Sequence, residues 1–338
     1  MRAIILGDMH LGVKNSSATY HNAAVELSKQ IIDYAIDHSI STLIQTGDLF
    51  DNRKAISHDT IETSHDIVTR FNDFFDMTYL IVGNHDTAKK DTMFPHSLVM
   101  FKEYDKVCVV DKPCFDNGVV MLPWIFSMED MNISSVADIC IGHFDINGAV
   151  MNSAGTISKN HNLNFSDFAK FKMTISGHYH TPKKYMHNVW YIGSPYQLTH
   201  NDAGSKRGFW VLDTDVDKEV LEFVEFTDYP HHYSYTDKTI SIDDIEGHIV
   251  RLTFTENHGI DGDKAIIEKF QKLNPYSLTV KYANMSDGMT EEEVSSAVMV
   301  KDKIDILYDF YDKSDLPESI NLVYLKKITQ SIYKGMKK

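Results

Sequence analysis

The chain has 338 residues, 43% hydrophobic and 24% charged, which is enough for a large core with one or two smaller units. No apolar run approaches the roughly 20 residues that a membrane span requires. Because Met1 leads straight into an apolar segment, we expect no signal peptide. The three scattered cysteines lack the spacing of a metal or redox motif, which favours reduced thiols and a cytoplasmic location.

The acidic balance of the chain limits its choice of partners. Binding to a phosphate backbone is largely electrostatic, so a net charge of −15 repels nucleic acid at long range. A nucleic-acid substrate would therefore require a local basic patch, bound metal, or a partner protein that supplies affinity.

Five short apolar runs are each followed by a glycine and a cluster of polar residues. The runs cover residues 3–6, 42–46, 79–82, 139–141 and 173–176. Runs of this length bounded by glycine predict buried strands. Segments with helical periodicity lie between them, at 21–38 and 58–75. Strands that alternate with helices predict a layered α/β domain whose functional loops lie at the carboxyl ends of the strands.

The pattern changes after about residue 228. A connector is followed by segments that predict a small β-α-β unit, at 248–255, 263–273 and 277–282. From Glu291 the periodicity is helical, with a break at Pro317. We therefore expect a main domain of residues 1–230, a small domain of 231–288 and a helical segment of 289–338.

The polar clusters contain seven side chains with the chemistry of metal ligands: Asp8, His10, Asp48, Asn84, His143, His178 and His180. Two adjacent divalent ions need about this many donors, with one carboxylate bridging them. Imidazole mixed with carboxylate or amide oxygen suits manganese, iron or zinc better than magnesium or calcium. Two aspartates against two divalent ions leave a positive surplus that can hold a phosphate and lower the pKa of a bridging water.

His85 follows the candidate ligand Asn84 and cannot easily turn toward the same ion. It is better placed to contact the phosphate, where it can neutralise charge or protonate the leaving oxygen. Such a histidine usually needs a partner on its other ring nitrogen. Asp51, three residues after Asp48, is the candidate for this orienting role.

The clusters together resemble the signature of the calcineurin-like metallophosphoesterases over the first two-thirds of the chain. The matching motifs are Gly7-Asp8-Met9-His10, Gly47-Asp48, Gly83-Asn84-His85-Asp86, Gly142-His143 and Gly177-His178-Tyr179-His180. Within this superfamily the chain is similar to the SbcD-type DNA-repair nucleases, phage recombination nucleases included. The resemblance implies an α/β fold: a two-sheet metallophosphoesterase sandwich flanked by helices, with a small α+β capping domain and a C-terminal helical segment.

The resemblance also implies how the metals are shared. It places Asp8, His10, Asp48 and His180 on one manganese ion, and Asp48, Asn84, His143 and His178 on the other, with His85 catalytic. Magnesium, iron and zinc are alternative ions. Some relatives carry a histidine at the position of Asp51, where it is associated with exonuclease behaviour, so exonuclease and endonuclease activity both stay open.

The family further implies a homodimer, a double- or single-stranded DNA substrate, and an SMC-like ATPase subunit of the SbcC type. The ATPase would dock on residues 289–338, although these helices could equally pack on the chain's own cap. Basic residues on or near the predicted active-site loops could contact DNA phosphates: Arg53, Lys54, Lys89, Lys90, Lys183, Lys184, Lys206 and Arg207.

Three functions compete. The leading one is a metal-dependent DNA exonuclease or endonuclease subunit that uses a two-metal-activated water in recombination, repair or replication, in the host cytoplasm if phage-encoded. The second is a phosphatase or small-molecule phosphodiesterase with the same centre, which the acidic charge favours. The third is a non-catalytic scaffold, which predicts eroded ligands, whereas all seven candidates are present.

Overall fold

The structure is a computed structural model that describes residues 1–124, 137–151, 155–160, 162–214, 220–256, 258–283 and 326–329. The chain divides into two compact units. The first is Met1–Tyr233 with Gly247–Ile249, and the second is Ser234–Glu246 with Val250–Lys338. Within the described ranges, no helix combines the length and the apolar character needed to cross a membrane.

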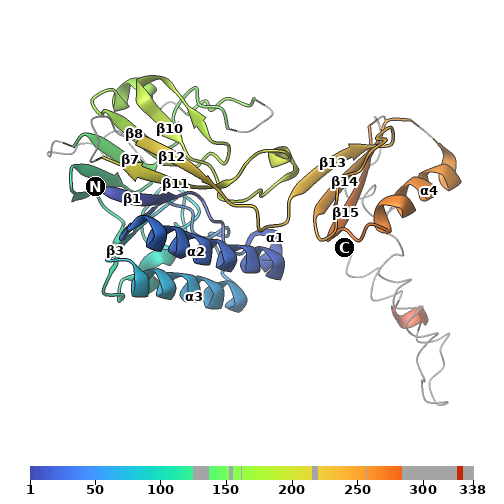
Figure 1. Ribbon diagram of the computed structural model, residues 1–338, viewed down its shortest axis with the longest axis horizontal. Coiled ribbons are helices and arrows are strands. Elements are labelled where there is room, and N and C mark those ends of the chain that lie inside the picture. The colour runs from blue at the N-terminus through green and yellow to red at the C-terminus, as the bar shows by residue number, and fades with distance from the viewer. Residues whose placement is uncertain are drawn as a thin grey trace, which may run out of the picture. The chain divides into compact units, whose positions relative to one another are not determined.

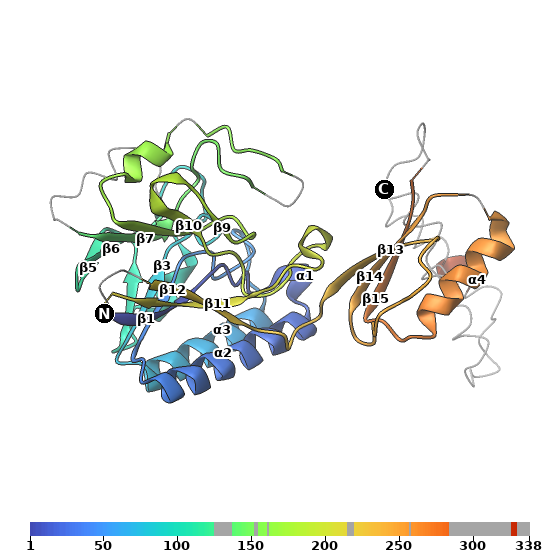
Figure 2. The ribbon, with the colours of Figure 1, turned by 45° about the horizontal axis from the view of Figure 1, so that its top comes forward.

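The first unit contains two six-stranded sheets (Figures 1 and 2). The first sheet has the order β12-β11-β1-β2-β3-β4. Its strands are β1 (Arg2–Leu6), β2 (Thr42–Gln45), β3 (Met77–Ile81), β4 (Val107–Val110), β11 (Gly208–Asp213) and β12 (Val220–Glu225). Strands β1 to β4 run parallel, and β11 and β12 extend the sheet in antiparallel fashion.

The second sheet has the order β5-β6-β7-β8-β10-β9. Its strands are β5 (Cys114–Asp116), β6 (Val119–Leu122), β7 (Ile139–His143), β8 (Met173–Gly177), β9 (Lys183–Lys184) and β10 (Val189–Tyr191). The central four, β6, β7, β8 and β10, are parallel, and the two edge strands are antiparallel. Both sheets are therefore mixed, with a parallel core.

Helices cover the outer face of the first sheet. The longest are α2 (Ala18–His38) and α3 (His58–Phe74), which lie side by side in both views (Figures 1 and 2). The Ser57 hydroxyl accepts a hydrogen bond from the Thr60 N–H, which caps the start of α3. The described part of the unit also contains short helical turns: α1 (Val13–Ser16) and 3₁₀ turns at Ser97–Phe101, Phe165–Phe168, Met186–Asn188 and His200–Asp202.

The sheets stack through a shared apolar layer. Fully buried side chains from both sheets, among them Ile5, Ile44, Ile141 and Ile175, form this layer. A separate cluster joins the first sheet to α2 and α3, and a third packs loops on the outer face of the second sheet. Burial on both faces explains why the central strands read as continuous apolar runs.

The parallel register brings the ends of the strands together. Leu6 pairs with Gln45, and Gln45 pairs with Leu80, so the loops after β1, β2 and β3 leave the same edge of the sheet. In the second sheet His143 pairs with Gly177, so β7 and β8 also end together. This is the arrangement that the sequence predicted for the polar clusters.

Besides the turn at residues 326–329, the described part of the second unit, together with the residues that border it, contains a three-stranded sheet and helix α4. The sheet has the order β13 (His232–Thr236), β14 (Ile249–Phe254), β15 (Ser277–Tyr282), with α4 (Gly259–Gln271) before β15. Ring contacts supply part of its core: Tyr235 lies 5.4 Å from Phe270, and Phe254 stacks on Tyr282 at 5.1 Å. An α+β unit therefore follows the sandwich, as the fold prediction required.

The predicted fold class is confirmed: two mixed sheets are flanked by helices in an α/β metallophosphoesterase-like arrangement. Helix α2 begins at Ala18 rather than at residue 21, so its first turn includes the buried Tyr20. Most of the predicted helical segment 289–338 lies outside the described residues. The exception is a single helical turn at residues 326–329. The roles assigned to the capping and helical regions stay predictions.

The layer between the sheets should dominate the stability of the sandwich. Ile141 is fully buried in it, so Ile141→Ala removes a packed side chain and leaves a cavity. We expect a loss of about 2–5 kcal/mol in the free energy of unfolding, measured by chemical denaturation. Ile36→Ala is the matched control because Ile36 is 58% exposed on α2. Equal losses in the two variants would contradict this account of the core.

Candidate metal centre

The structure brings all seven candidate ligands to one place, at the carboxyl ends of β1, β2, β3, β7 and β8. Asp8, His10, Asp48, Asn84 and His143 are buried, whereas His178 and His180 are partly exposed. Ligands separated by 59, 94 and 170 residues in the sequence therefore meet in a single cluster.

One group of donors is formed by Asp8, His10 and His180, whose ligand atoms all lie within 4.8 Å of one another. The Nε2 atoms of His10 and His180 face each other at 3.0 Å. Asp8 Oδ2 accepts the backbone N–H of His178 and lies 3.9 Å from His180 Nε2. This loop-to-strand contact holds the His178–His180 segment against β1.

A second group is formed by Asp48, His143 and His178, again within 4.8 Å. The Asn84 side-chain oxygen lies 2.9 Å from His143 Nε2 and 2.8 Å from His178 Nδ1. Asp48 links the two groups, because its Oδ2 lies 3.3 Å from His143 Nε2 and 3.8 Å from His10 Nε2. Asp48 therefore has the position of a bridging carboxylate.

The donor geometry fits a pair of divalent cations. Donor atoms that share one ion at about 2.0–2.1 Å lie about 3 Å apart, as several of these atoms do. Because the Thr46 carbonyl can only accept, His143 Nδ1 donates to it, so neutral His143 points a lone pair at the oxygens of Asp48 and Asn84. Buried Asp8 Oδ1 has no hydrogen-bond partner among the described residues. A cation between these acceptors would remove the repulsion and the unsatisfied oxygen.

Tight backbone geometry holds the ligands. A Cβ on Gly177 would lie 2.4 Å from Asp8 Oδ1, and one on Gly83 would lie 2.3 Å from Asp48 Oδ1. Only glycine allows these loops to approach the carboxylates so closely. His10, Asp48 and His178 adopt left-handed backbone conformations, with φ of 46°, 53° and 88°. Non-glycine residues in this region are uncommon and cluster at functional sites.

The protonation states show what the centre is like without a cation. Burial, reinforced by the charge of Asp48, raises the pKa of Asp8 to about 7. Burial alone would lower the pKa of His143, but the charge and hydrogen bond of Asp48 raise it to about 9. Both groups must lose their proton to act as ligands.

His85 lies beside the two groups. Its ring is 4.9 Å from that of His10, and its backbone N–H donates to Asp48 Oδ1 at 2.7 Å. We predicted that the Asp51 carboxylate orients His85, but the structure makes this contact with the Asp51 backbone carbonyl, 2.6 Å from Nδ1. The carboxylate lies instead 3.3 Å from His10 Nδ1. Because a carbonyl only accepts, Nδ1 of His85 carries hydrogen and Nε2 is left to exchange a proton.

Asp86 is a supporting residue to which the sequence reasoning gave no role. Its buried carboxylate accepts the backbone N–H groups of Gly83 at 2.9 Å, Phe50 at 3.1 Å and Leu49 at 3.4 Å. It therefore ties the loop that carries Asn84 and His85 to the loop that carries Asp48. The position of Asp86 directly after Gly83-Asn84-His85 was the available signal, but its partners are 36 and 37 residues away.

Most of the basic residues predicted to contact DNA are on the surface. Arg53 lies close enough to His85 for its charge to lower the pKa of that histidine, an effect secondary to burial. Lys54, Lys89, Lys90, Lys183, Lys184 and Lys206 are exposed. Lys183 and Lys184 lie over the rings of Tyr185 and Trp190, and Lys206 pairs with Glu225 at 2.6 Å.

The prediction that Arg207 contacts DNA is wrong, because its side chain is fully buried and cannot contact DNA in this conformation. Its guanidinium pairs with Asp202 at 2.7 Å, and donates to the Ser194 hydroxyl and to the His180 backbone carbonyl. Burial of a charge requires such pairing. Arg207 therefore holds the segment of the candidate ligand His180 in place.

Comparison with known proteins agrees with the geometry. Residues 1–182 match the profile of the calcineurin-like phosphoesterases. The chain belongs to this family, and it is accordingly a phosphoesterase enzyme.

Two curated relatives act on nucleic acid according to their names. The chain is 34% identical over 316 residues to exonuclease subunit 1 of Enterobacteria phage T4, covering 89% of each protein. It is 27% identical over 116 residues to the DNA double-strand break repair protein Mre11 of Saccharolobus solfataricus, covering 34% of this chain and 30% of that protein. A solved dimetal phosphatase from Danio rerio aligns with a TM-score of 0.37 and 9% identity, over 66% of this chain and 98% of that one.

The bridging position of Asp48 can be tested by metal content. Asp48→Asn should weaken both ions together, because this carboxylate borders both donor groups. His10→Ala should weaken mainly one, since His10 belongs with Asp8 and His180. Manganese per chain, measured after equilibrium dialysis, should fall toward zero in the first variant and toward half in the second. Equal retention in both would contradict the assignment.

Metal binding should release protons. Asp8, with a pKa of about 7, and His143, with a pKa of about 9, hold protons at neutral pH that a cation must displace. Apparent affinity for Mn²⁺ should therefore rise with pH between about 6 and 9. Calorimetric titrations in buffers of different ionisation enthalpy measure the released protons directly. A binding heat that does not depend on the buffer would contradict this prediction.

Proposed function

We propose that the protein is a metal-dependent nuclease that hydrolyses phosphodiester bonds in DNA. The observation that carries this proposal is the convergence of seven donors on two adjacent groups that share Asp48. The relatives support a nucleic-acid substrate, because one is named an exonuclease subunit and the other a DNA break repair protein. We infer the same reaction class here, with manganese as the preferred ion.

In this proposal the residues of the chain have distinct tasks. Asp8, His10, Asp48 and His180 would hold one ion, and Asp48, Asn84, His143 and His178 the other. When bound, such ions neutralise phosphate charge and lower the pKa of a water held between them. Asp86 and Arg207 keep the ligand loops in register through their backbone contacts.

His85 would act on the leaving group. The Asp51 carbonyl fixes hydrogen on Nδ1, which leaves Nε2 to bind the phosphate or to protonate the departing oxygen. Burial lowers the pKa of His85, and the charge of Asp48 offsets only part of this effect. A lowered pKa makes the protonated form a stronger acid, which suits proton donation in the transition state.

We also propose the assembly that the family resemblance implied. The enzyme would act as a homodimer with an SMC-like ATPase subunit of the SbcC type, docking on residues 289–338. The name of the phage relative, a numbered exonuclease subunit, is in keeping with a multisubunit enzyme. Such a partner would supply DNA affinity that a net charge of −15 does not. The complex would work in the cytoplasm, during recombination, repair or replication.

A phosphatase or small-molecule phosphodiesterase is the second candidate, and the acidic net charge favours it. One assay distinguishes the two candidate functions. The purified chain with Mn²⁺ is given duplex DNA, single-stranded DNA and a chromogenic phosphodiester, each with and without the ATPase partner. If the protein hydrolysed the chromogenic phosphodiester but neither form of DNA, even with the partner present, the nuclease proposal would be wrong.

The role of His85 can be tested separately from metal binding. His85→Ser should lower turnover of DNA by about 100-fold or more, the loss typical of a general acid or charge stabiliser. Manganese content should not change, because His85 is not in the proposed donor set. His65→Ser on α3, away from the centre, is the matched control and should keep full activity. Full activity in the His85 variant would disprove the assigned role.

A further inference from the structure

A polar cavity of about 370 Å³ opens beside the metal centre. Its lining includes Leu11 and Gly12, which directly follow the candidate ligand His10, and Asp51 with Asn52. The volume is within the range of about 300–1,000 Å³ that is common for small-molecule sites. None of the tasks assigned above uses this cavity.

Asp51 connects the cavity to the reacting groups. Its carbonyl accepts from His85 Nδ1 at 2.6 Å, and its carboxylate lies 3.3 Å from His10 Nδ1. Asp51 therefore lies between the cavity and the imidazoles of His10 and His85. A phosphodiester bound at the centre has a substituent on each side, and one of them can reach this space.

The chemistry of the lining selects the substituent. None of the described residues that line the cavity is cationic, and Asp51 contributes a negative charge. A second phosphate would be repelled there. Amide and hydroxyl groups from Asn15, Asn52 and Ser57 alternate with the apolar side chains of Ala55 and Ile56. Neutral hydrogen-bonding groups mixed with apolar surface suit a sugar and base.

The wall formed by residues 12–16 is built in an unusual conformation. Lys14 and Asn15 have left-handed φ/ψ values of 55°, 47° and 57°, 47°, and Ser16 has a φ of 60°. The Ser16 hydroxyl accepts hydrogen bonds from Ser57 at 2.7 Å and Thr60 at 3.1 Å. The wall is therefore fixed to the start of α3, so the cavity is preformed.

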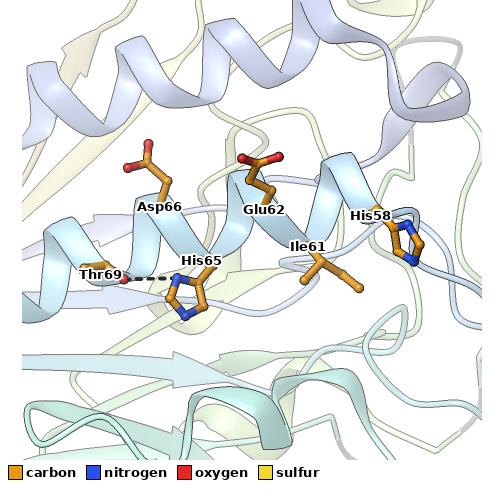
Figure 3. A pocket seen from close by; sticks show the side chains of 6 residues that line it. All are labelled: His58, Ile61, Glu62, His65, Asp66 and Thr69. Carbon is orange, nitrogen blue, oxygen red and sulfur yellow. Dashed lines mark hydrogen bonds between the residues drawn. The ribbon is translucent and has the colours of Figure 1, made fainter.

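A second cavity, of about 500 Å³, is not part of the metal centre. It lies along α3, where it is lined by His58, Ile61, Glu62, His65, Asp66 and Thr69 (Figure 3). All of these residues come from one helix, and none of them belongs to the metal centre. This second cavity has no connection to the reaction, but it supplies a control position.

We propose that the cavity beside Asp51 binds the sugar and base of the nucleotide next to the scissile phosphate. The inference rests on the proposed nuclease function and deepens it. The cavity makes the enzyme favour nucleoside phosphodiesters over simple esters through neutral contacts, and it adds nothing to attraction for the DNA backbone.

The test fills the cavity and measures a ratio. Ala55→Trp adds bulk from an exposed lining residue without removing a core side chain. The ratio of kcat/KM for a short oligothymidylate to kcat/KM for bis(p-nitrophenyl) phosphate should fall about tenfold or more. Because a folding defect lowers both rates together, the ratio isolates the cavity. Ile61→Trp, at a partly exposed position on α3, should keep the wild-type ratio.

Salt dependence identifies the occupant. The slope of log kcat/KM against log salt concentration should be the same in Ala55→Trp and wild type, because no phosphate contact is lost. A shallower slope would mean that a backbone phosphate occupies the cavity, and an unchanged substrate ratio would mean that nothing does. Either result would overturn this inference about the cavity and would leave the proposed nuclease function standing. A wild-type enzyme that cleaves the aryl ester but no DNA overturns the proposed function, and the inference with it.

Discussion

The structure depends on the burial of the Asp48 carboxylate among groups that cannot all be satisfied by one another. One of its oxygens accepts the His85 backbone N–H, and the other faces the imidazoles of His143 and His10. Asp8 and Asn84 add further oxygen acceptors in the same buried space. Divalent cations would resolve this conflict, because they would displace the protons held by Asp8 and His143 and coordinate acceptors such as Asp8 Oδ1, which has no hydrogen-bond partner among the described residues.

Holding such a cluster requires a stiff support, which the sandwich supplies. Ligands come from strand ends in both sheets, and the apolar layer between the sheets fixes the distance from β1 and β2 to β7 and β8. Buried polar side chains then secure the loops: Asp86 joins two of them through backbone N–H groups, and Arg207 holds the His180 carbonyl. Three ligands keep left-handed backbone conformations in this setting. The strain is tolerated because many contacts determine each loop.

The acidic charge and a DNA substrate are compatible if attraction is local. In the proposed mechanism the metal centre would concentrate positive charge where the scissile phosphate binds, and Arg53 lies near His85. Exposed lysines on neighbouring loops can add to this, but Arg207 cannot, since its charge is neutralised inside the protein by Asp202. The neutral cavity beside Asp51 would then contribute selectivity without contributing charge. In the proposed assembly, a partner subunit would supply the long-range affinity.

The sequence alone indicated the candidate ligand set and determined the class of fold. Asp8, Asp48, Asn84, His143 and His178 each come at or just after the end of an apolar strand, and that local pattern suffices to place each of them at the carboxyl edge of its sheet. Contacts between distant residues were decided only by the tertiary structure. The sequence identified Asp51 as a candidate. It did not reveal that the Asp51 carbonyl faces His85 while the carboxylate faces His10. The sequence showed that Arg207 is a cation, but it did not reveal that this side chain is buried against the carbonyl of His180, 27 residues away. Pattern and spacing reveal which groups are near a strand end, whereas the direction of each atom depends on packing against segments far along the chain.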